Sequence, residues 1–187
     1  MKVYVVRHGQ STSNLAGISC GWTDVDLTPQ GEQDALKAKD ILNGIAFDKV
    51  YSSDLLRARR TAAIALPDAT PELTPLLREI NVGNMAGTVL STIPLERRIR
   101  LRREGYHEFG GETHDEFQSR ARDFLSQLET LDCENVAVFT HAGLLISMLE
   151  AILAAPIIHQ NVRCANCAVG IFEYTGAQWK LYGWINP

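Results

Sequence analysis

Two kinds of hydrophobic segment alternate along the chain. Short runs of β-branched and aromatic residues, bounded by polar residues, predict buried strands over 3–6, 47–51 and 135–140. Apolar residues at helical spacing predict helices over 29–42, 54–66, 113–131 and 142–155. Near the C-terminus, apolar segments at 167–174 and 178–184 flank Thr175-Gly176, which predicts a hairpin. Strands alternating with helices predict a mostly parallel sheet that is covered on both faces.

The ends of the predicted helices carry capping signals. Thr28 and Pro29 form a hydroxyl N-cap followed by proline at the first helical position, and Asn43-Gly44 ends that helix. The next helix follows the second strand directly, so Ser53 or Asp54 is placed to cap it. A surface loop then follows, because prolines stand at 67, 71 and 75.

Residues 76–112 have no regular pattern and are rich in glycine, which predicts a lid over the sheet rather than core. Within them, Arg97–Arg103 is strongly basic. We expect a solvated helix there, although the same charges would suit a second anionic group of a ligand. No repeat, low-complexity tract or linker divides the chain, so residues 1–187 are expected to form a single domain.

Composition excludes several classes of protein. The 187 residues are 45% apolar and 21% charged, as in soluble globular proteins. A net charge of −4 argues against nucleic acid as a partner, and no apolar run reaches the roughly 20 residues of a membrane span. The chain opens without a signal-peptide pattern, and its four cysteines are scattered. We therefore expect a cytoplasmic protein with no disulfide framework and no membrane partner.

Reactive residues follow three of the predicted strands. Arg7-His8 follows the first strand, Ser53 to Arg57 follow the second, and His141 follows the third. Ligands of parallel sheets bind outside the carboxyl ends of the strands, so these side chains are expected at one edge. The N–H groups of the helix that follows His8 should point at the same place, which suits an anion.

This edge would hold Arg7, Arg57, His8, His141 and Asn14, a set of cations and hydrogen-bond donors. Guanidinium groups bind phosphate oxygens as forked donors. Neighbouring cations disfavour imidazolium and would keep His8 neutral, which is the form that a nucleophile needs. We therefore interpret His8 as a nucleophile that accepts a phosphoryl group, although the sequence does not show what fixes its ring.

Phosphoryl transfer also needs a proton for the leaving oxygen, and Glu79 is our candidate for the donor. Its apolar neighbours would desolvate it, which suits a general acid that works near neutral pH. Three other acids remain rivals for this role, namely Asp24, Asp54 and Glu112.

Several motifs, in order along residues 2 to about 145, resemble those of the histidine phosphatase superfamily, phosphoglycerate-mutase-like branch. They are Arg7-His8-Gly9, Gly21 to Gly31, Ser53 to Thr61, Leu77-Arg-Glu79, Gly110-Gly-Glu-Thr113 and Thr140-His141-Ala-Gly143. The resemblance implies a three-layer α/β/α sandwich with a six-stranded sheet, phosphorylation of His8, proton donation by Glu79 and no metal or cofactor. It also implies a phosphate pocket formed by Arg7, Asn14, Arg57 and His141, with Cys20, Gly21 and Gly143 among the substrate-binding residues.

Within this family the chain is similar to compact phosphatases such as α-ribazole phosphatase. Mutases usually have tryptophan where this chain has Ser13, and a different sequence at 79–83; Ala86 in turn departs from the phosphatases. We expect a phosphatase acting on a small phosphorylated metabolite. A cofactor-dependent phosphoglycerate mutase and a non-catalytic phosphate-binding module remain alternatives, and both monomer and homodimer remain open.

The remaining polar motifs have simpler interpretations. No two histidines have the His-x-His spacing of metal ligands, and we place His107, His114 and His159 on the surface. Cys164-x-x-Cys167 precedes a strand rather than opening a helix, so packing is expected there instead of a redox pair or half a zinc site. Trp22 is likewise expected to serve packing.

Overall fold

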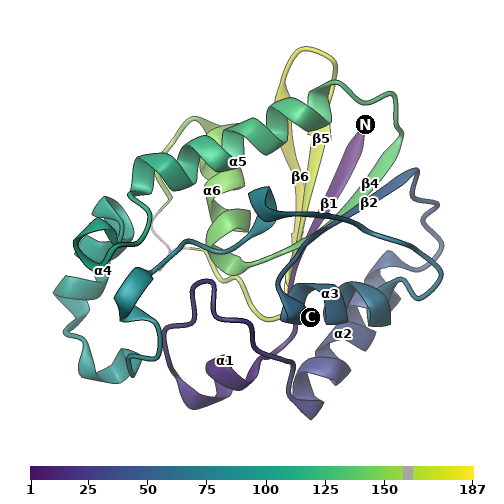
Figure 1. The fold of residues 1–187 in the computed structure, drawn as a ribbon. Coiled ribbons are helices and arrows are strands. Elements are labelled where there is room, and N and C mark those ends of the chain that lie inside the picture. Colours follow the sequence, from purple (N-terminus) through teal and green to yellow (C-terminus); the bar gives the residue numbers. More distant parts are fainter. Residues whose placement is uncertain (158–161) are drawn as a thin grey trace.

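A six-stranded sheet forms the centre of the computed structural model, which describes residues 1–157 and 162–187 (Figure 1). The strand order is β3-β2-β4-β1-β5-β6. The strands are β1 (Lys2–Arg7), β2 (Lys49–Ser53), β3 (Glu72–Thr74), β4 (Asn135–Thr140), β5 (Val169–Tyr174) and β6 (Trp179–Ile185). Strands β3, β2, β4 and β1 pair in parallel, whereas β5 is antiparallel to both β1 and β6. The expected mostly parallel sheet is confirmed.

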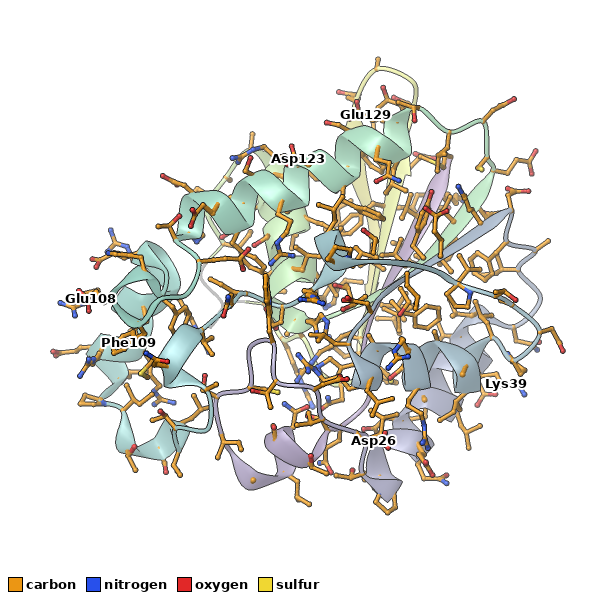
Figure 2. The ribbon with its side chains drawn as sticks, viewed as in Figure 1. Asp26, Lys39, Glu108, Phe109, Asp123 and Glu129 are labelled. Atoms are coloured by element: carbon orange, nitrogen blue, oxygen red, sulfur yellow. The ribbon has the colours of Figure 1, made fainter. Side chains whose placement is uncertain are left out.

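Helices cover both faces of this sheet, as Figure 1 shows. One face packs against α5 (His114–Glu129) and α6 (Ala142–Leu153), and the other against α2 (Pro29–Leu42) and α3 (Leu56–Ala65). Alternation along β4 explains the two layers, because Val136 and Val138 join the first core while Ala137 and Phe139 join the second. The three-layer α/β/α sandwich is confirmed. Figure 2 shows the exposed residues Asp123 and Glu129 on the outer side of α5.

Two helices begin where the sequence predicts, and a third does not have the predicted cap. Thr28 caps α2, and Thr113 forms a capping box at the start of α5. Neither Ser53 nor Asp54 caps α3, because Ser53 Oγ accepts from Leu55 N and Asp54 pairs with Arg78. The N–H of Leu56 instead donates to Asp24, 2.6 Å away, from a loop distant in sequence.

The segment 75–112 is a chain of short turns and one helix over the carboxyl edge of the sheet. It contains 3-10 turns at Pro75–Leu77, Gly83–Met85, Leu90–Thr92 and His107–Phe109, and the helix α4 (Leu95–Glu104). Leu101 anchors α4 in a small apolar cluster, while most of its arginines are exposed. Whether the segment moves as a lid stays a prediction.

The boundaries of two predicted segments differ in the structure. The predicted proline-rich loop includes β3, and the predicted strand 47–51 shifts to Lys49–Ser53. His159 lies outside the described residues. Within the described ranges, no helix is long and apolar enough to cross a membrane.

Candidate active site

The reactive residues meet because β1 and β4 are adjacent and parallel. Arg7 pairs with Thr140 in the register, so His8 and His141 leave the sheet side by side. Their ring centroids lie 5.1 Å apart. Beside them, β2 leads through Ser53 to Arg57 in the first turn of α3. The sheet topology thus brings together the residues that the sequence predicted at one edge.

A cavity of about 240 Å³ opens at this edge. Most of the predicted site residues line it: Arg7, His8, Asn14, Cys20, Gly21, Arg57, Glu79 and Gly143. His141 is fully buried next to His8, so it supports the cavity from behind.

The ring of His8 is fixed by a backbone carbonyl. Its Nδ1 lies 2.7 Å from the carbonyl oxygen of Gly9, and because a carbonyl can only accept, Nδ1 carries the hydrogen. In the neutral ring, Nε2 therefore keeps its lone pair. Burial, followed by the charges of Arg57 and Arg7, holds the pKa of His8 well below its usual value. His8 is thus neutral at pH 7, and its geometry leaves the lone pair on Nε2.

Arg57 is 2% exposed and its guanidinium is held in place. One Nη donates to the carbonyl of Thr23 at 3.0 Å and the other to the carbonyl of Gly21 at 2.9 Å. Burial lowers the pKa of Arg57 from its ordinary value. The loop containing Gly21 therefore positions this charge.

Arg7 is held by the C-terminal third of the chain. Its Nη1 donates to the carbonyl of Cys164, whereas its buried Nε has no partner within the described ranges. Asn166 donates to the carbonyl of His8 and to Oδ1 of Asn14, both at 3.2 Å. The loop before β5 thus ties the two sides of the catalytic turn together.

Asn14 belongs to a capping box rather than to a free helix end. In α1 (Thr12–Ala16), its Oδ1 accepts from Ser11 N, while Ser11 Oγ accepts from Asn14 N. Ser11 Oγ thus accepts from Asn14 N, and the carbonyl of Asp26 accepts from Thr12 N, so these two N–H groups of the helix do not face an anion as expected. The side-chain NH₂ of Asn14 remains as a donor at the cavity.

Glu79 reaches the cavity with both carboxylate oxygens held by backbone donors. Oε1 accepts from Ile80 N at 2.9 Å and Oε2 from Gly143 N at 3.1 Å. Its own carbonyl accepts from Trp22 Nε1 at 2.7 Å and from Arg120, so Trp22 does more than pack. The backbone at this position is therefore fixed from outside the cavity.

The rival acids are occupied elsewhere. Asp24 caps α3, and Asp54 forms two hydrogen bonds of 2.7 and 2.6 Å with Arg78. Glu112 pairs with Arg120. None of the three lines the cavity, so Glu79 is the one of the four candidates that does.

His141 has one hydrogen-bonded and one free ring nitrogen. Nε2 lies 2.9 Å from Ser53 Oγ, and the buried Nδ1 has no partner among the residues that the structure describes. Burial, with the charges of Arg57 and neighbouring groups, holds the pKa of His141 well below its usual value. A buried ring atom without a partner next to a cavity is suited to a bound ligand.

Arg102, from the basic run that was considered as a ligand contact, also lines the cavity. Several other cavity residues were not predicted from the sequence. They are Tyr106 from the segment over the sheet, His114 and Phe117 from α5, and Ser147 and Glu150 from α6. The surface assignment of His114 is wrong, whereas His107 is exposed as expected. The α5 and α6 residues were not predicted, because helical periodicity shows which face of a helix is buried but not whether that face borders a cavity.

The cysteines are all free thiols. Burial raises the pKa of Cys164 to about 11 and that of Cys167 to about 12, so both thiols stay protonated. In the described part of the chain, no group of three or more His, Cys, Asp or Glu side chains is arranged to hold a metal ion.

The chain is similar in sequence and fold to several known proteins. A phosphoglycerate mutase structure from Thermus thermophilus is 34% identical with a TM-score of 0.75, covering 94% of each chain. The probable phosphoglycerate mutase GpmB of Salmonella paratyphi A is 27% identical over 194 residues, 99% of this chain and 90% of the relative. A mycobacterial glucosyl-3-phosphoglycerate phosphatase shares the fold, with 24% identity, a TM-score of 0.85 and 96% of each chain covered. The model of the histidine phosphatase superfamily (branch 1) matches residues 3–187, and the chain belongs to that superfamily.

Proposed function

We propose that the protein hydrolyses small phosphomonoesters by transferring the phosphoryl group first to Nε2 of His8 and then to water. The observation that carries this proposal is the hydrogen bond from His8 Nδ1 to the Gly9 carbonyl. It directs the lone pair of Nε2 away from the backbone, in a ring that two neighbouring arginines keep neutral. Membership of the superfamily supports the same chemistry.

The phosphate would bind among fixed donors. Arg57 and Arg7 supply charge, and each is already oriented by backbone carbonyls. Ser53 Oγ accepts from Leu55 N, so its proton is available to His141 Nε2; Nδ1 of His141 can then donate to a phosphoryl oxygen. Such donors stabilise the charge of the transferring group without rearranging during the reaction.

The proton balance is assigned to Glu79. In the first step the lone pair of His8 Nε2 forms a bond to phosphorus, the ester P–O bond breaks, and Glu79 gives its proton to the leaving oxygen. In the second step the Glu79 carboxylate takes a proton from water, whose oxygen attacks phosphorus as the N–P bond breaks. His8 then regains its neutral form and inorganic phosphate leaves.

The test is hydrolysis of p-nitrophenyl phosphate by a His8→Ala variant, with the exposed His107→Ala as the control. We expect His8→Ala to lose all but a trace of activity, because the nucleophile is gone, while His107→Ala retains it. Acid-labile phosphate should appear on the wild-type protein after mixing with substrate. Substantial hydrolysis by His8→Ala would overturn the proposal, and absence of both phosphoprotein and turnover would favour a non-catalytic phosphate-binding module.

A phosphoglycerate mutase is the second candidate, because relatives of the chain carry that name. The phosphohistidine would then return its phosphoryl group to a sugar acid instead of water. Incubation with 3-phosphoglycerate and a bisphosphoglycerate primer separates the two functions. We expect release of inorganic phosphate without isomerisation, and efficient isomerisation would establish the mutase instead.

A further inference from the structure

One face of α6 runs from the catalytic centre to the far end of the cavity. Gly143, whose N–H holds Glu79, is followed at helical spacing by Ser147 and Glu150, and all three line the cavity. At a rise of about 1.5 Å per residue, Glu150 lies about 10 Å along the helix from Gly143. The cavity therefore has a phosphate end and a distal end, and the leaving group would occupy the distal end.

Glu150 is held in place without using all its acceptor positions. Its Oε1 accepts from Ile157 N at 2.8 Å, and its Oε2 accepts from Gln118 Nε2. Each carboxylate oxygen can accept two hydrogen bonds, so each retains a free position. One turn nearer the catalytic centre, Ser147 is 3% exposed and lines the cavity. Its hydroxyl can both donate to and accept from a ligand bound there.

The bond between Glu150 and Gln118 also brings α5 to this end of the cavity. His114 lies one turn before Gln118, and Phe117 directly precedes it; both line the cavity. Arg102 and Tyr106 belong to the other wall. Tyr106 packs with the apolar cluster that contains Val82 and Ile80, and both Arg102 and Tyr106 reach the cavity from the segment 75–112. The distal end thus combines a carboxylate, a hydroxyl, an imidazole and an aromatic face.

We propose that Glu150, Ser147 and His114 form a leaving-group subsite for a neutral, hydroxyl-rich group, as in a sugar phosphate. Hydroxyl groups both donate and accept, which matches the mixture of acceptor and donor groups here. A second phosphate or carboxylate would be repelled by the charge of Glu150, and an ammonium group, which can only donate, would leave the donor groups of Ser147 and His114 unmatched. The inference rests on the proposed phosphatase function, because it assigns the group that leaves from phosphorus.

The test compares four phosphate esters on the intact protein. They are ribose 5-phosphate (a neutral polyol), 3-phosphoglycerate (a second anion), phosphoethanolamine (an ammonium) and p-nitrophenyl phosphate (no polyol). We expect ribose 5-phosphate to exceed both charged esters in kcat/KM by about tenfold or more, the usual value of one hydrogen bond to a charged group. Preference for either charged ester would overturn the proposal and identify the other class.

Variants then test the residues. Glu150→Gln keeps the shape of the side chain but removes its charge, and should lower the ratio of kcat/KM for ribose 5-phosphate to that for p-nitrophenyl phosphate by about tenfold, mainly through KM. Ser147→Ala should lower the same ratio. If Glu150→Gln proves too unstable to assay, as shown by a much lower melting temperature, the Ser147→Ala ratio tests the subsite instead. The exposed Glu134→Gln, at the opposite end of β4, is the matched control. An unchanged ratio in both subsite variants would overturn the assignment.

A binding measurement separates this inference from the proposed function. Calorimetry of ribose 5-phosphate binding to His8→Ala, with and without Glu150→Gln, requires no turnover. Weaker binding in the double variant by about tenfold supports the subsite even if hydrolysis fails, and equal binding contradicts it.

Discussion

His8 and His141 are buried without a carboxylate partner. Each is 5% exposed or less, and their hydrogen bonds go to the carbonyl of Gly9 and the hydroxyl of Ser53. Neighbouring arginines add to the effect of burial, so both rings are held neutral in the folded protein. The same arrangement that prepares a nucleophile therefore makes the fold sensitive to acid.

This sensitivity gives a prediction on stability against pH. The folded-state pKa of both histidines is lowered, so the unfolded chain binds more protons below about pH 6.5, the usual histidine pKa. The contribution of these two histidines to the free energy of unfolding should be constant above about pH 6.5 and should decrease as the pH falls below that value. The slope is up to about 1.4 kcal/mol per pH unit for each ring. Denaturant unfolding between pH 5 and 7.5 measures it.

Two variants serve as controls for the pH prediction. His8→Gln removes one of the titrating rings and should flatten the decline, whereas His107→Gln replaces an exposed ring and should leave the slope as it is. A wild-type stability that rises on acidification from pH 6.5 would contradict the explanation.

Gly143 gives a second prediction at this scale. A Cβ built on Gly143 would lie 2.1 Å from Oε1 of Glu79, so alanine must displace that carboxylate. We expect Gly143→Ala to lower kcat for p-nitrophenyl phosphate by roughly 100-fold, the lower range for loss of a general acid. Because both changes act on the same group, adding Glu79→Gln should cost little more. Gly183→Ala, whose Cβ meets atoms at 3.5 Å or beyond, is the control.

Among the elements, α3 depends on a residue outside it. The helix begins after Leu55, which has no side-chain cap, and Asp24 accepts from the N–H of Leu56 at 2.6 Å. The helix carries Arg57, so this contact positions a buried cation of the cavity as well as closing the helix end.

The expected result of Asp24→Ala is a loss of about 1 kcal/mol in the free energy of unfolding, typical of a removed N-cap acceptor. Asp24→Asn keeps an acceptor and should recover most of that loss. Chemical denaturation of the two variants measures the difference. Equal destabilisation by alanine and asparagine would show that the charge of Asp24, not the cap, matters.

The same element shows what the sequence could and could not predict. The cap of α2 comes from Thr28, directly before the helix, so a local pattern predicted it. Thr113 caps α5 in the same way, although only the start of that helix was predicted. Asp24 acts across 32 residues, and no local pattern contains that contact. His8, Arg57 and His141 were predicted because strand order alone places strand ends together. Glu150 was not, since its position depends on how α5 packs against α6.

For the whole molecule, the cavity contains more arginines than acids although the chain carries a net charge of −4. Arg7, Arg57 and Arg102 line the cavity, accompanied by the acids Glu79 and Glu150. Two fixed guanidinium groups beside His8 can neutralise a phosphate dianion without a cation from solution.

We accordingly expect hydrolysis of p-nitrophenyl phosphate to be unchanged by prolonged treatment with EDTA. Replacement of Arg57 by lysine should instead lower kcat/KM by an order of magnitude or more, because lysine cannot bridge the Gly21 and Thr23 carbonyls as a rigid fork. A loss of activity in EDTA that divalent metal restores would refute metal independence.

The loop before β5 determines when the site can exist during synthesis. Cys164 holds Arg7, Asn166 contacts the His8 carbonyl, and the carbonyl of Ala168 accepts from Arg7 N. The turn that carries His8 can therefore be completed only after Cys164 has been translated, 157 residues after Arg7. A nascent chain released before that loop is made would carry His8 but lack these contacts, so under the proposed function we expect such a truncated chain to have no hydrolytic activity.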